Sequence, residues 1–230
     1  MNFSFPRYLI FSLIIVASFS CKKKPPAAKS DEGVIEYRIE YLNDKVGNFS
    51  TGVLPQTMVV KFKKNKVKNS IEGAMGFFSL INIANLSEMT NATYLKFVDK
   101  KYAYEGQKNE EPCCIKQFEG MKVTLTDETK EIIGFIGKRA NISFPDTNQD
   151  SFSVYYTTEI KLKNPNIMNP YKEIPGVLLE FRTNLGHTNM LMIAEKYYPE
   201  NLPDKEFHLP RNYRKVTKNE MEKILNALLE

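Results

Sequence analysis

The stretch that decides the fold is residues 33–41, GVIEYRIEY, in which apolar and charged side chains alternate. The apolar set is Ile35, Tyr37, Ile39 and Tyr41, and the charged set between them is Glu36, Arg38 and Glu40. A period of two is typical of a strand with one face on a core and the other in water. The sequence therefore predicts that residues 33–41 form a strand in a sheet with one buried face.

The same alternation recurs along most of the chain. Further strands are predicted at residues 58–63, 67–71, 94–98, 102–104, 122–126, 132–144, 152–162, 177–183 and 190–197. Turns are predicted at residues 43–52, at Asn65, and at Asp127, Glu128 and Thr129, where polar turn formers gather. Many short strands of this kind are typical of an antiparallel sheet.

The chain ends in an amphipathic helix. Thr217 and Glu220 have the spacing of a capping box, which satisfies backbone N–H groups at a helix start. One apolar stripe follows, made of Met221, Ile224, Leu225, Leu228 and Leu229. Because this stripe needs an apolar partner, we expect the helix to pack on the concave face of a strongly curved antiparallel sheet. The predicted class is α+β, mainly β, with a single domain at residues 33–230.

Residues 73–86, GAMGFFSLINIANL, form the least polar part of the chain beyond its N-terminal segment, and no charged side chain occurs before Glu88. Periodicity alone does not separate a buried helix, a pair of short strands and a flap over a cavity in such a run. All three interpretations stay open at this point.

The N-terminal segment has the order of a bacterial lipoprotein signal. Arg7 precedes an apolar run, and small residues lead to Cys21, whose thiol would accept acyl chains after cleavage. The apolar run is shorter than the roughly 20 residues that span a bilayer, which disfavours the alternative, an uncleaved anchor helix. We expect a signal peptide at residues 1–20 and a lipid-anchored flexible tether at residues 21–32. An acidic run after the lipidated cysteine would resemble a signal for export to the cell surface. No acidic run follows Cys21, so we expect the protein on the periplasmic face of the outer membrane.

Composition excludes some partners. Cleavage before Cys21 removes one basic and no acidic residue, so 31 basic and 27 acidic residues remain. This excess of basic over acidic residues is too small to indicate a nucleic-acid partner. The two remaining cysteines, Cys113 and Cys114, are adjacent, so they are either free thiols or a vicinal disulfide.

No arrangement of residues predicts catalysis or metal binding. His187 and His208 have no cysteine, histidine or carboxylate at the spacing of a zinc site, and we expect both on the surface. The chain has no GxSxG motif, and Gly73 and Gly76 lack the Lys-Ser/Thr of a phosphate-binding loop. We therefore predict no catalytic residues, no metal, no cofactor and no enzymatic activity.

Several short motifs together resemble a family of Bacteroidetes proteins. They are KEIIGFIGKRA at residues 130–140, VYYT at 154–157, PYKEIPGVLLE at 170–180, and the opening Gly33, Ile35 and Tyr37. This pattern is similar to a domain-of-unknown-function family related to the GLPGLI proteins, although Gly137 stands where that family often has cysteine. The resemblance implies a half-barrel like that of the lipoprotein carrier LolA and its receptor LolB, with an apolar cavity for acyl chains. In such a fold, the turn at Ile174, Pro175 and Gly176 would lead into a central strand.

The leading functional hypothesis is a non-enzymatic outer-membrane lipoprotein that binds a lipid or lipopeptide in its curved sheet. The candidate cavity residues are Met75, Phe77, Phe78, Leu80, Ile81, Val177, Leu179 and Phe181. A cavity of roughly 300 Å³ or more would favour this hypothesis, whereas these residues could also simply fill the core. The alternative hypothesis is a structural accessory subunit that binds an outer-membrane protein of an assembly, secretion or uptake complex.

Overall fold

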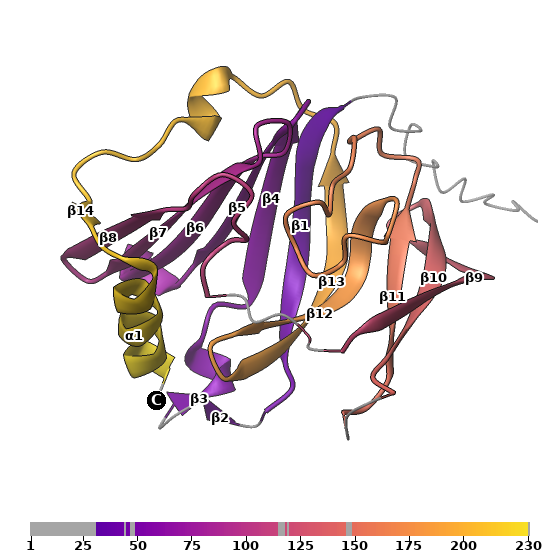
Figure 1. The fold of residues 1–230 in the computed structure, drawn as a ribbon, viewed down its shortest axis with the longest axis horizontal. Coiled ribbons are helices and arrows are strands. Elements are labelled where there is room, and N and C mark those ends of the chain that lie inside the picture. The colour runs from indigo at the N-terminus through magenta and orange to yellow at the C-terminus, as the bar shows by residue number, and fades with distance from the viewer. Residues whose placement is uncertain are drawn as a thin grey trace, which may run out of the picture.

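The computed structural model describes residues 31–43, 45–46, 49–114, 118, 120–145 and 149–229. Its main feature is one 12-stranded sheet, which is strongly curved and not closed (Figure 1). The strand order is β14-β8-β7-β6-β5-β4-β1-β13-β12-β11-β10-β9, and every neighbouring pair is antiparallel except β14 with β8. The prediction of a mainly β protein built on a large curved antiparallel sheet is therefore confirmed.

The central strand is β1 (Glu32–Tyr41), which pairs with β4 on one side and β13 on the other. On the β4 side lies a group that we call the N-terminal wing: β4 (Thr57–Lys63), β5 (Lys66–Glu72), β6 (Phe78–Asn85), β7 (Thr90–Phe97), β8 (Lys100–Glu105) and β14 (Arg214–Lys215). On the other side lies the C-terminal wing: β9 (Lys122–Ile132), β10 (Phe135–Ser143), β11 (Phe152–Thr157), β12 (Val177–Leu185) and β13 (Thr188–Tyr198). Most strands of each wing follow one another along the chain as hairpins. The exceptions are β14, which comes from near the C-terminus and pairs in parallel with β8, and the pair β11 and β12, which a long connection joins.

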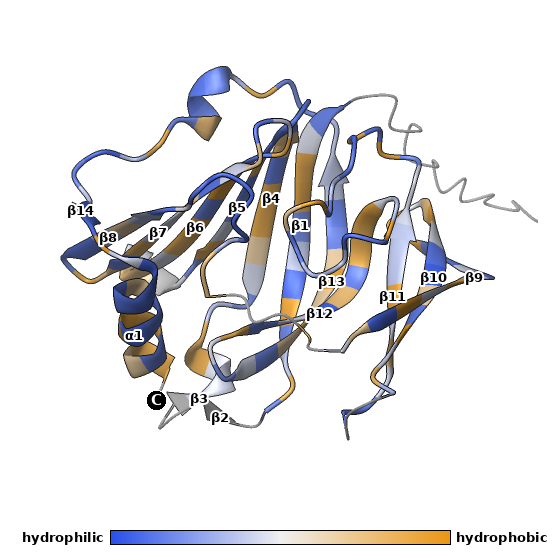
Figure 2. Cartoon of the chain, viewed as in Figure 1, coloured by the Kyte–Doolittle hydropathy of each residue, from blue (hydrophilic) through white to orange (hydrophobic). Residues whose placement is uncertain are grey.

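Alternation along the strands separates the two faces of the sheet. Hydrophobic and hydrophilic residues alternate as bands along β1 and its neighbours (Figure 2). Ile35, Tyr37 and Ile39 are buried in the main core, while the charged side chains between them are half-buried or exposed. The period-two prediction for this stretch is confirmed.

The predicted turn at Asp127–Thr129 is wrong. Strand β9 continues through these residues to Ile132, and its pairing with β10 shifts register opposite Lys138 and Ala140. The turn lies at Ile133 and Gly134, which both have positive φ, 46° and 83°. Two residues with positive φ suit the twist of a hairpin, so the single strand predicted at residues 132–144 does not start at Ile132 but at Phe135.

The uncharged stretch at residues 73–86 forms one 3₁₀ turn, Ala74–Gly76, followed by the single strand β6. It is neither a helix nor a pair of strands. Both faces of β6 are apolar because Leu80 faces the concave side, while Ile81 packs with the Ile83 and Tyr94 cluster on the opposite side. A strand covered on both faces loses the alternation that would identify it.

Residues 43–52, predicted as a turn, include two short paired strands, β2 (Lys45–Val46) and β3 (Phe49–Ser50). A 3₁₀ turn, Thr51–Val53, follows them. The prediction of local, turn-like structure is therefore correct only in outline.

A long connection, residues 158–176, joins β11 to β12 and crosses in front of β1 and β13 (Figure 1). The strand predicted at residues 152–162 therefore ends early, at Thr157. Buried Asn166 fixes the connection, since its side-chain amide donates to the carbonyls of Ile174 at 2.9 Å and Gly176 at 2.8 Å. A Cβ on Gly176 would lie 2.4 Å from the Thr157 carbonyl oxygen, so glycine allows the backbone of the connection to pass close to the end of β11.

The helix α1 (Lys218–Leu229) lies at the end of the sheet that carries β8, on the concave side (Figure 1). The capping box is present, because the Glu220 N–H donates to the Thr217 hydroxyl and the Thr217 N–H donates to the Glu220 carboxylate. Met221 and Leu225 are fully buried in the main core, as the apolar stripe predicted. No helix among the described residues is long and apolar enough to cross a membrane.

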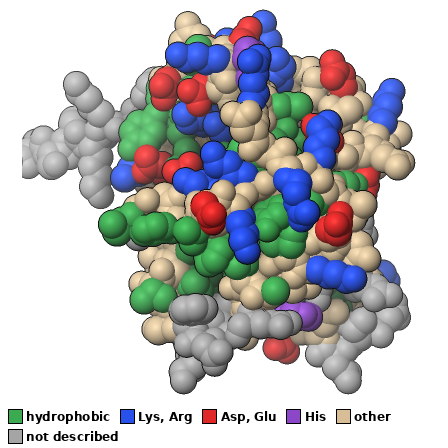
Figure 3. Space-filling view, turned by 90° about the vertical axis from the view of Figure 1, so that its left-hand side faces the viewer, with side chains coloured by type: hydrophobic (Ala, Val, Ile, Leu, Met, Phe, Trp, Pro, Cys, Tyr) green, Lys and Arg blue, Asp and Glu red, His purple; other side chains and the backbone are tan. Residues whose placement is uncertain are grey.

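The opposite, convex side is crossed by a segment that contains the 3₁₀ turn η3 (Asp204–Phe207). Phe207 packs with Val34, and ion pairs join Lys61 to Glu206 at 2.8 Å and Lys63 to Asp204 at 3.0 Å. On the side of the molecule shown in Figure 3, basic and acidic side chains are interspersed around a band of hydrophobic ones. This surface carries no continuous basic stripe.

Candidate functional site

Two apolar cavities lie on the concave side of the sheet. The first, of about 190 Å³, lies between the strands on both sides of β1 and the 158–176 connection. Its walls include Tyr37, Val60, Leu80, Phe181 and Tyr171. The second, of about 270 Å³, lies toward the C-terminal end of α1, and its walls include Phe77, Phe78, Phe97, Leu228 and Leu229.

The two cavities are neighbours, because Ile71, Leu185 and Met190 line both of them. Each cavity alone is smaller than the roughly 300 Å³ at the lower end of ligand pockets. Together they form one apolar surface that extends from the 158–176 connection to α1. Among the described residues, every side chain that lines either cavity is uncharged.

Five of the eight candidate cavity residues line these spaces. Leu80, Val177 and Phe181 line the first cavity, and Phe77 and Phe78 line the second. Four of them come from strands on both sides of β1, and Phe77 directly precedes β6. Sequence spacing alone does not bring these segments together.

The other three candidates lie elsewhere. Met75 is 88% exposed and lines neither cavity. Ile81 lies on the opposite face of the sheet from Leu80, because neighbouring residues of a strand point to opposite sides. Leu179 is fully buried in the main core and lines neither space.

Three polar side chains of the first cavity were not predicted. Asn69, Asn82 and Thr93 occupy directly paired positions on β5, β6 and β7. A sequence signal exists for the first of them, since Asn69 is in phase with Val67 and Ile71, where alternation calls for an apolar residue. A polar residue in the apolar phase of a strand is a candidate for ligand contact.

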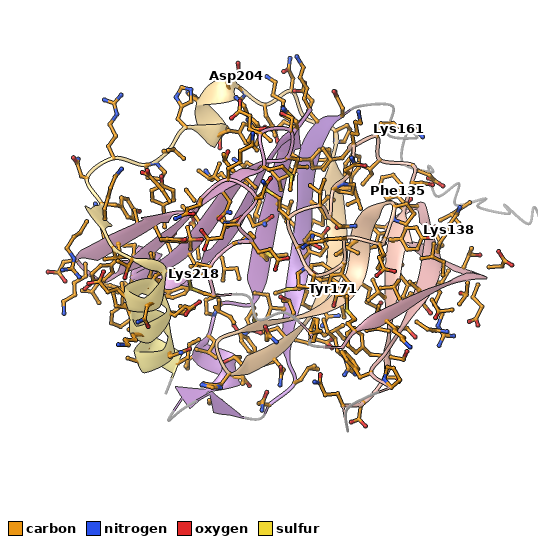
Figure 4. The ribbon with its side chains drawn as sticks, viewed as in Figure 1. Phe135, Lys138, Lys161, Tyr171, Asp204 and Lys218 are labelled. Carbon is orange, nitrogen blue, oxygen red and sulfur yellow. A yellow bond between two sulfur atoms is a disulfide. The ribbon has the colours of Figure 1, made fainter. Side chains whose placement is uncertain are left out.

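The roof of the first cavity is held by hydrogen bonds and aromatic contacts. Asn169 donates from its side-chain amide to the Asn166 side-chain oxygen at 3.1 Å. Tyr171, labelled at the centre of Figure 4, donates to the Arg182 carbonyl and packs edge-on against Phe181. Burial raises the pKa of the Tyr171 hydroxyl, so this group stays a neutral donor.

The floor of the same cavity is fixed by Tyr37 of β1. Its hydroxyl donates to the Leu178 carbonyl at 2.7 Å, and its ring meets Phe181 edge-on with centroids 5.8 Å apart. Burial raises the pKa of Tyr37 as well. The two rings therefore join β1 to β12 across the concave face.

Cys113 and Cys114 form a disulfide, the second of the two states that the sequence left open. Both residues are buried, and Cys113 lines the first cavity beside Pro112. The Cys114 carbonyl accepts a hydrogen bond from the Gly186 N–H of the β12–β13 turn. The pair therefore belongs to the apolar wall and to the contacts that hold it.

Among the carboxylates that the structure describes, Glu110 has the strongest pKa shift, and it lies where α1 meets β8. The Tyr104 hydroxyl donates to Glu110 at 2.6 Å, and together with the Gln107 N–H and Lys218 it lowers the pKa of Glu110 to about 2. This carboxylate is outside both cavities. Its contacts tie the loop after β8 to the start of α1.

No group of three or more metal-ligating side chains comes together within the part of the chain that the structure describes. His187 and His208 are both exposed, as expected. Cys21, the predicted signal peptide and most of the tether lie outside the described residues, and β1 begins at Glu32, the last residue assigned to the tether.

Comparison with known proteins supports the fold. No family model and no curated protein sequence matches this chain. A solved structure described as "Structure of PNGF-II in P21 space group" is similar, with a TM-score of 0.54 and 15% sequence identity. The match covers 85% of this chain and 33% of that chain, so the present chain spans about a third of the length of PNGF-II. At this identity the similarity shows a shared fold alone.

Proposed function

We propose that this protein is a non-enzymatic envelope lipoprotein that binds a lipid or lipopeptide on the concave face of its sheet. The observation that carries the proposal is the pair of adjoining cavities, in which every described wall residue is uncharged. Uncharged walls of this kind favour an acyl chain, because burial of its methylene groups is worth about 0.8 kcal/mol each.

The curved, unclosed sheet with a helix on its concave side is consistent with a half-barrel like that of LolA and LolB. Membership of a GLPGLI-related family, acylation of Cys21 and a location on the periplasmic face of the outer membrane are part of the same proposal. An acyl anchor at Cys21 would hold the domain at a bilayer, because several acyl chains give nearly permanent attachment.

The first test is native mass spectrometry of the chain from residue 21 with the substitution Cys21→Ser, exported in its own host behind a signal peptide that is cleaved without lipidation and purified from the envelope. This substitution removes the proposed anchor lipid, so any lipid that remains bound occupies the domain itself. We expect an adduct of acyl-chain mass that is released by organic solvent. A protein without such an adduct, and without affinity for the hydrocarbon dye diphenylhexatriene, would overturn the proposal.

A matched pair of variants on β6 locates the site. Leu80→Trp places a larger side chain in the first cavity, whereas Ile81→Trp places it on the opposite face of the same strand. We expect Leu80→Trp to weaken binding of diphenylhexatriene about tenfold and Ile81→Trp to change it less than about twofold. Circular dichroism controls for loss of structure in either variant.

One observation favours the alternative, an accessory subunit of an outer-membrane complex. Strand β9 ends the 12-stranded sheet, and most of its residues are exposed. An exposed sheet edge can accept a strand from a partner. If this alternative is correct, the protein extracted in mild detergent will retain a membrane-protein partner, and Thr126→Pro on β9 will release it while binding of diphenylhexatriene is unchanged.

A further inference from the structure

Three polar side chains form a continuous row across the floor of the first cavity. Asn69 pairs with Asn82 across β5 and β6, and Asn82 pairs with Thr93 across β6 and β7. Directly paired residues have Cβ atoms about 5 Å apart. The row therefore runs perpendicular to the strands, over three of them, and most of the side chains around it are apolar.

The hydrogen-bonding capacity of this row is only partly used. The Asn82 side-chain amide donates to the Ala92 carbonyl and the Thr93 hydroxyl, both at 3.3 Å. The Asn69 side chain makes no hydrogen bond to any residue that the structure describes, although it lies beside the cavity. Asn69 thus offers two N–H donors and a carbonyl acceptor to whatever occupies the space.

The roof asparagines provide a contrast. Asn166 and Asn169 also line the cavity, but their side chains are used by the 158–176 connection itself. Their role in the connection explains why they are polar. Nothing in the sheet gives the same explanation for Asn69, whose neighbours in phase, Val67 and Ile71, are apolar.

The absence of charge on the described walls of both cavities limits the ligand. A buried charge without a partner costs far more free energy than a buried neutral group that is hydrogen-bonded. A free carboxylate or ammonium at the Asn69 position would meet only amides and hydroxyls. A ligand with one neutral polar group beside an apolar chain matches both the row and the surrounding surface.

We infer that Asn69 and Asn82 bind the neutral amide of an N-acyl chain, whose hydrocarbon part lies along the apolar walls of the two cavities. This inference rests on the proposed lipid binding and adds the chemistry of the polar group. An amide is favoured over other neutral groups because it presents both a donor and an acceptor, as the Asn69 side chain does.

The test uses three probes on the chain from residue 21 with Cys21→Ser: diphenylhexatriene, N-methyldodecanamide and dodecanoate at pH 8. The amide and the carboxylate are measured by displacement of the dye. We expect the amide to bind at least about tenfold more tightly than the carboxylate. Asn69→Leu, which keeps side-chain volume and removes the amide, should weaken binding of N-methyldodecanamide about fivefold, the effect of one hydrogen bond.

Control variants separate the possible outcomes. Asn69→Gln should keep most of the preference for the amide, and Ser70→Ala, on the opposite face of β5, should not alter it. Diphenylhexatriene, which forms no hydrogen bonds, should bind wild type and Asn69→Leu within about twofold. If the dye binds but Asn69→Leu leaves amide affinity unchanged, the inference is wrong and lipid binding stands. If neither the dye nor the amide binds wild type, the proposed function itself is wrong.

Discussion

On one side of β1, strands β10 and β11 of the C-terminal wing pack into a closed core, whereas on the other side the N-terminal wing leaves part of its inner face bare. In the C-terminal wing, Ala140, Ile142 and Val154 are fully buried, and the 158–176 connection covers them through Tyr171 and Ile174. In the N-terminal wing, every residue of β5 is partly or fully exposed, and three of its side chains line the first cavity.

This difference in packing depends on which segments cover each wing of the sheet. Both wings consist mostly of similar antiparallel strands, so strand pattern alone does not set how well a face is filled. The 19-residue connection folds over the C-terminal wing and reaches the edge of the N-terminal wing, where Met168 packs with Ala84 and Leu86. Helix α1 covers the N-terminal wing toward β8, and the cavities lie between these two covers. The uncovered portion is where the proposed ligand would complete the packing.

The largest expected effect comes from truncating one leucine in the filled region. Leu179→Ala should lower the free energy of unfolding by about 3 kcal/mol, because Leu179 is fully buried and its removal leaves a cavity. Leu80→Ala should cost about 1 kcal/mol, since Leu80 already faces empty space. Urea denaturation measures both. Equal losses would mean that the two regions are packed equally well.

The second effect concerns the entry to β12. Gly176→Ala should destabilise the protein by about 2 kcal/mol, because its Cβ would meet the Thr157 carbonyl oxygen at 2.4 Å, and backbone there has to move. Gly52→Ala is the matched control, since the nearest atom to its Cβ would be 3.8 Å away. A Gly176→Ala variant as stable as Gly52→Ala would show that the 158–176 connection is not tightly fixed.

The third effect tests the cover of the N-terminal wing. Thr217→Ala removes the hydroxyl that caps α1 and should cost about 1 kcal/mol, whereas Thr217→Ser keeps the cap and should cost little. Because Leu228 and Leu229 of α1 line the second cavity, the alanine variant should also speed hydrogen exchange along the helix. Unchanged exchange would indicate that packing of Met221 and Leu225 alone holds α1 in place.

The smallest effect is a pH dependence at the junction of α1 and β8. The pKa of Glu110 is lowered from 4.5 to about 2, so its stabilising contribution is complete above pH 4.5 and is lost as the pH falls toward 2. We expect Glu110→Gln to be less stable than wild type at pH 7, by less than about 1 kcal/mol because solvent screens the partly exposed ion pair with Lys218. The gap should shrink at pH 3. Glu200→Gln, at an exposed position, is the control, and a gap that is constant with pH would contradict the assignment.

The sheet and the helix could be predicted because their signals are local. Alternation around Tyr37 and the cap formed by Thr217 and Glu220 depend only on neighbouring residues. The hairpin at Ile133 and Gly134 was missed because Asp127–Thr129 offered a more familiar turn composition, although threonines are also good strand formers.

The candidate site was predictable only in part, because it depends on the register between distant strands. Phe181 and Leu80 lie about a hundred residues apart in the chain and still line one cavity. Ile81 and Leu179 are apolar like the residues of the cavity walls, but an apolar side chain alone does not show which face of its strand borders a cavity. The paired positions of Asn69, Asn82 and Thr93 became visible only once the hairpins fixed which residues lie side by side.

The pairing of β1 with β13 also constrains the order in which the protein can assemble. Val34 is opposite Tyr198, so β1 and β13 can pair only after most of the chain has been synthesised. Until then, one edge of the first strand stays open, and contacts between distant residues of this kind form slowly. Unpaired strand edges can pair with other chains during folding. The nascent protein should therefore depend on a chaperone until β13 has been synthesised and pairs with β1.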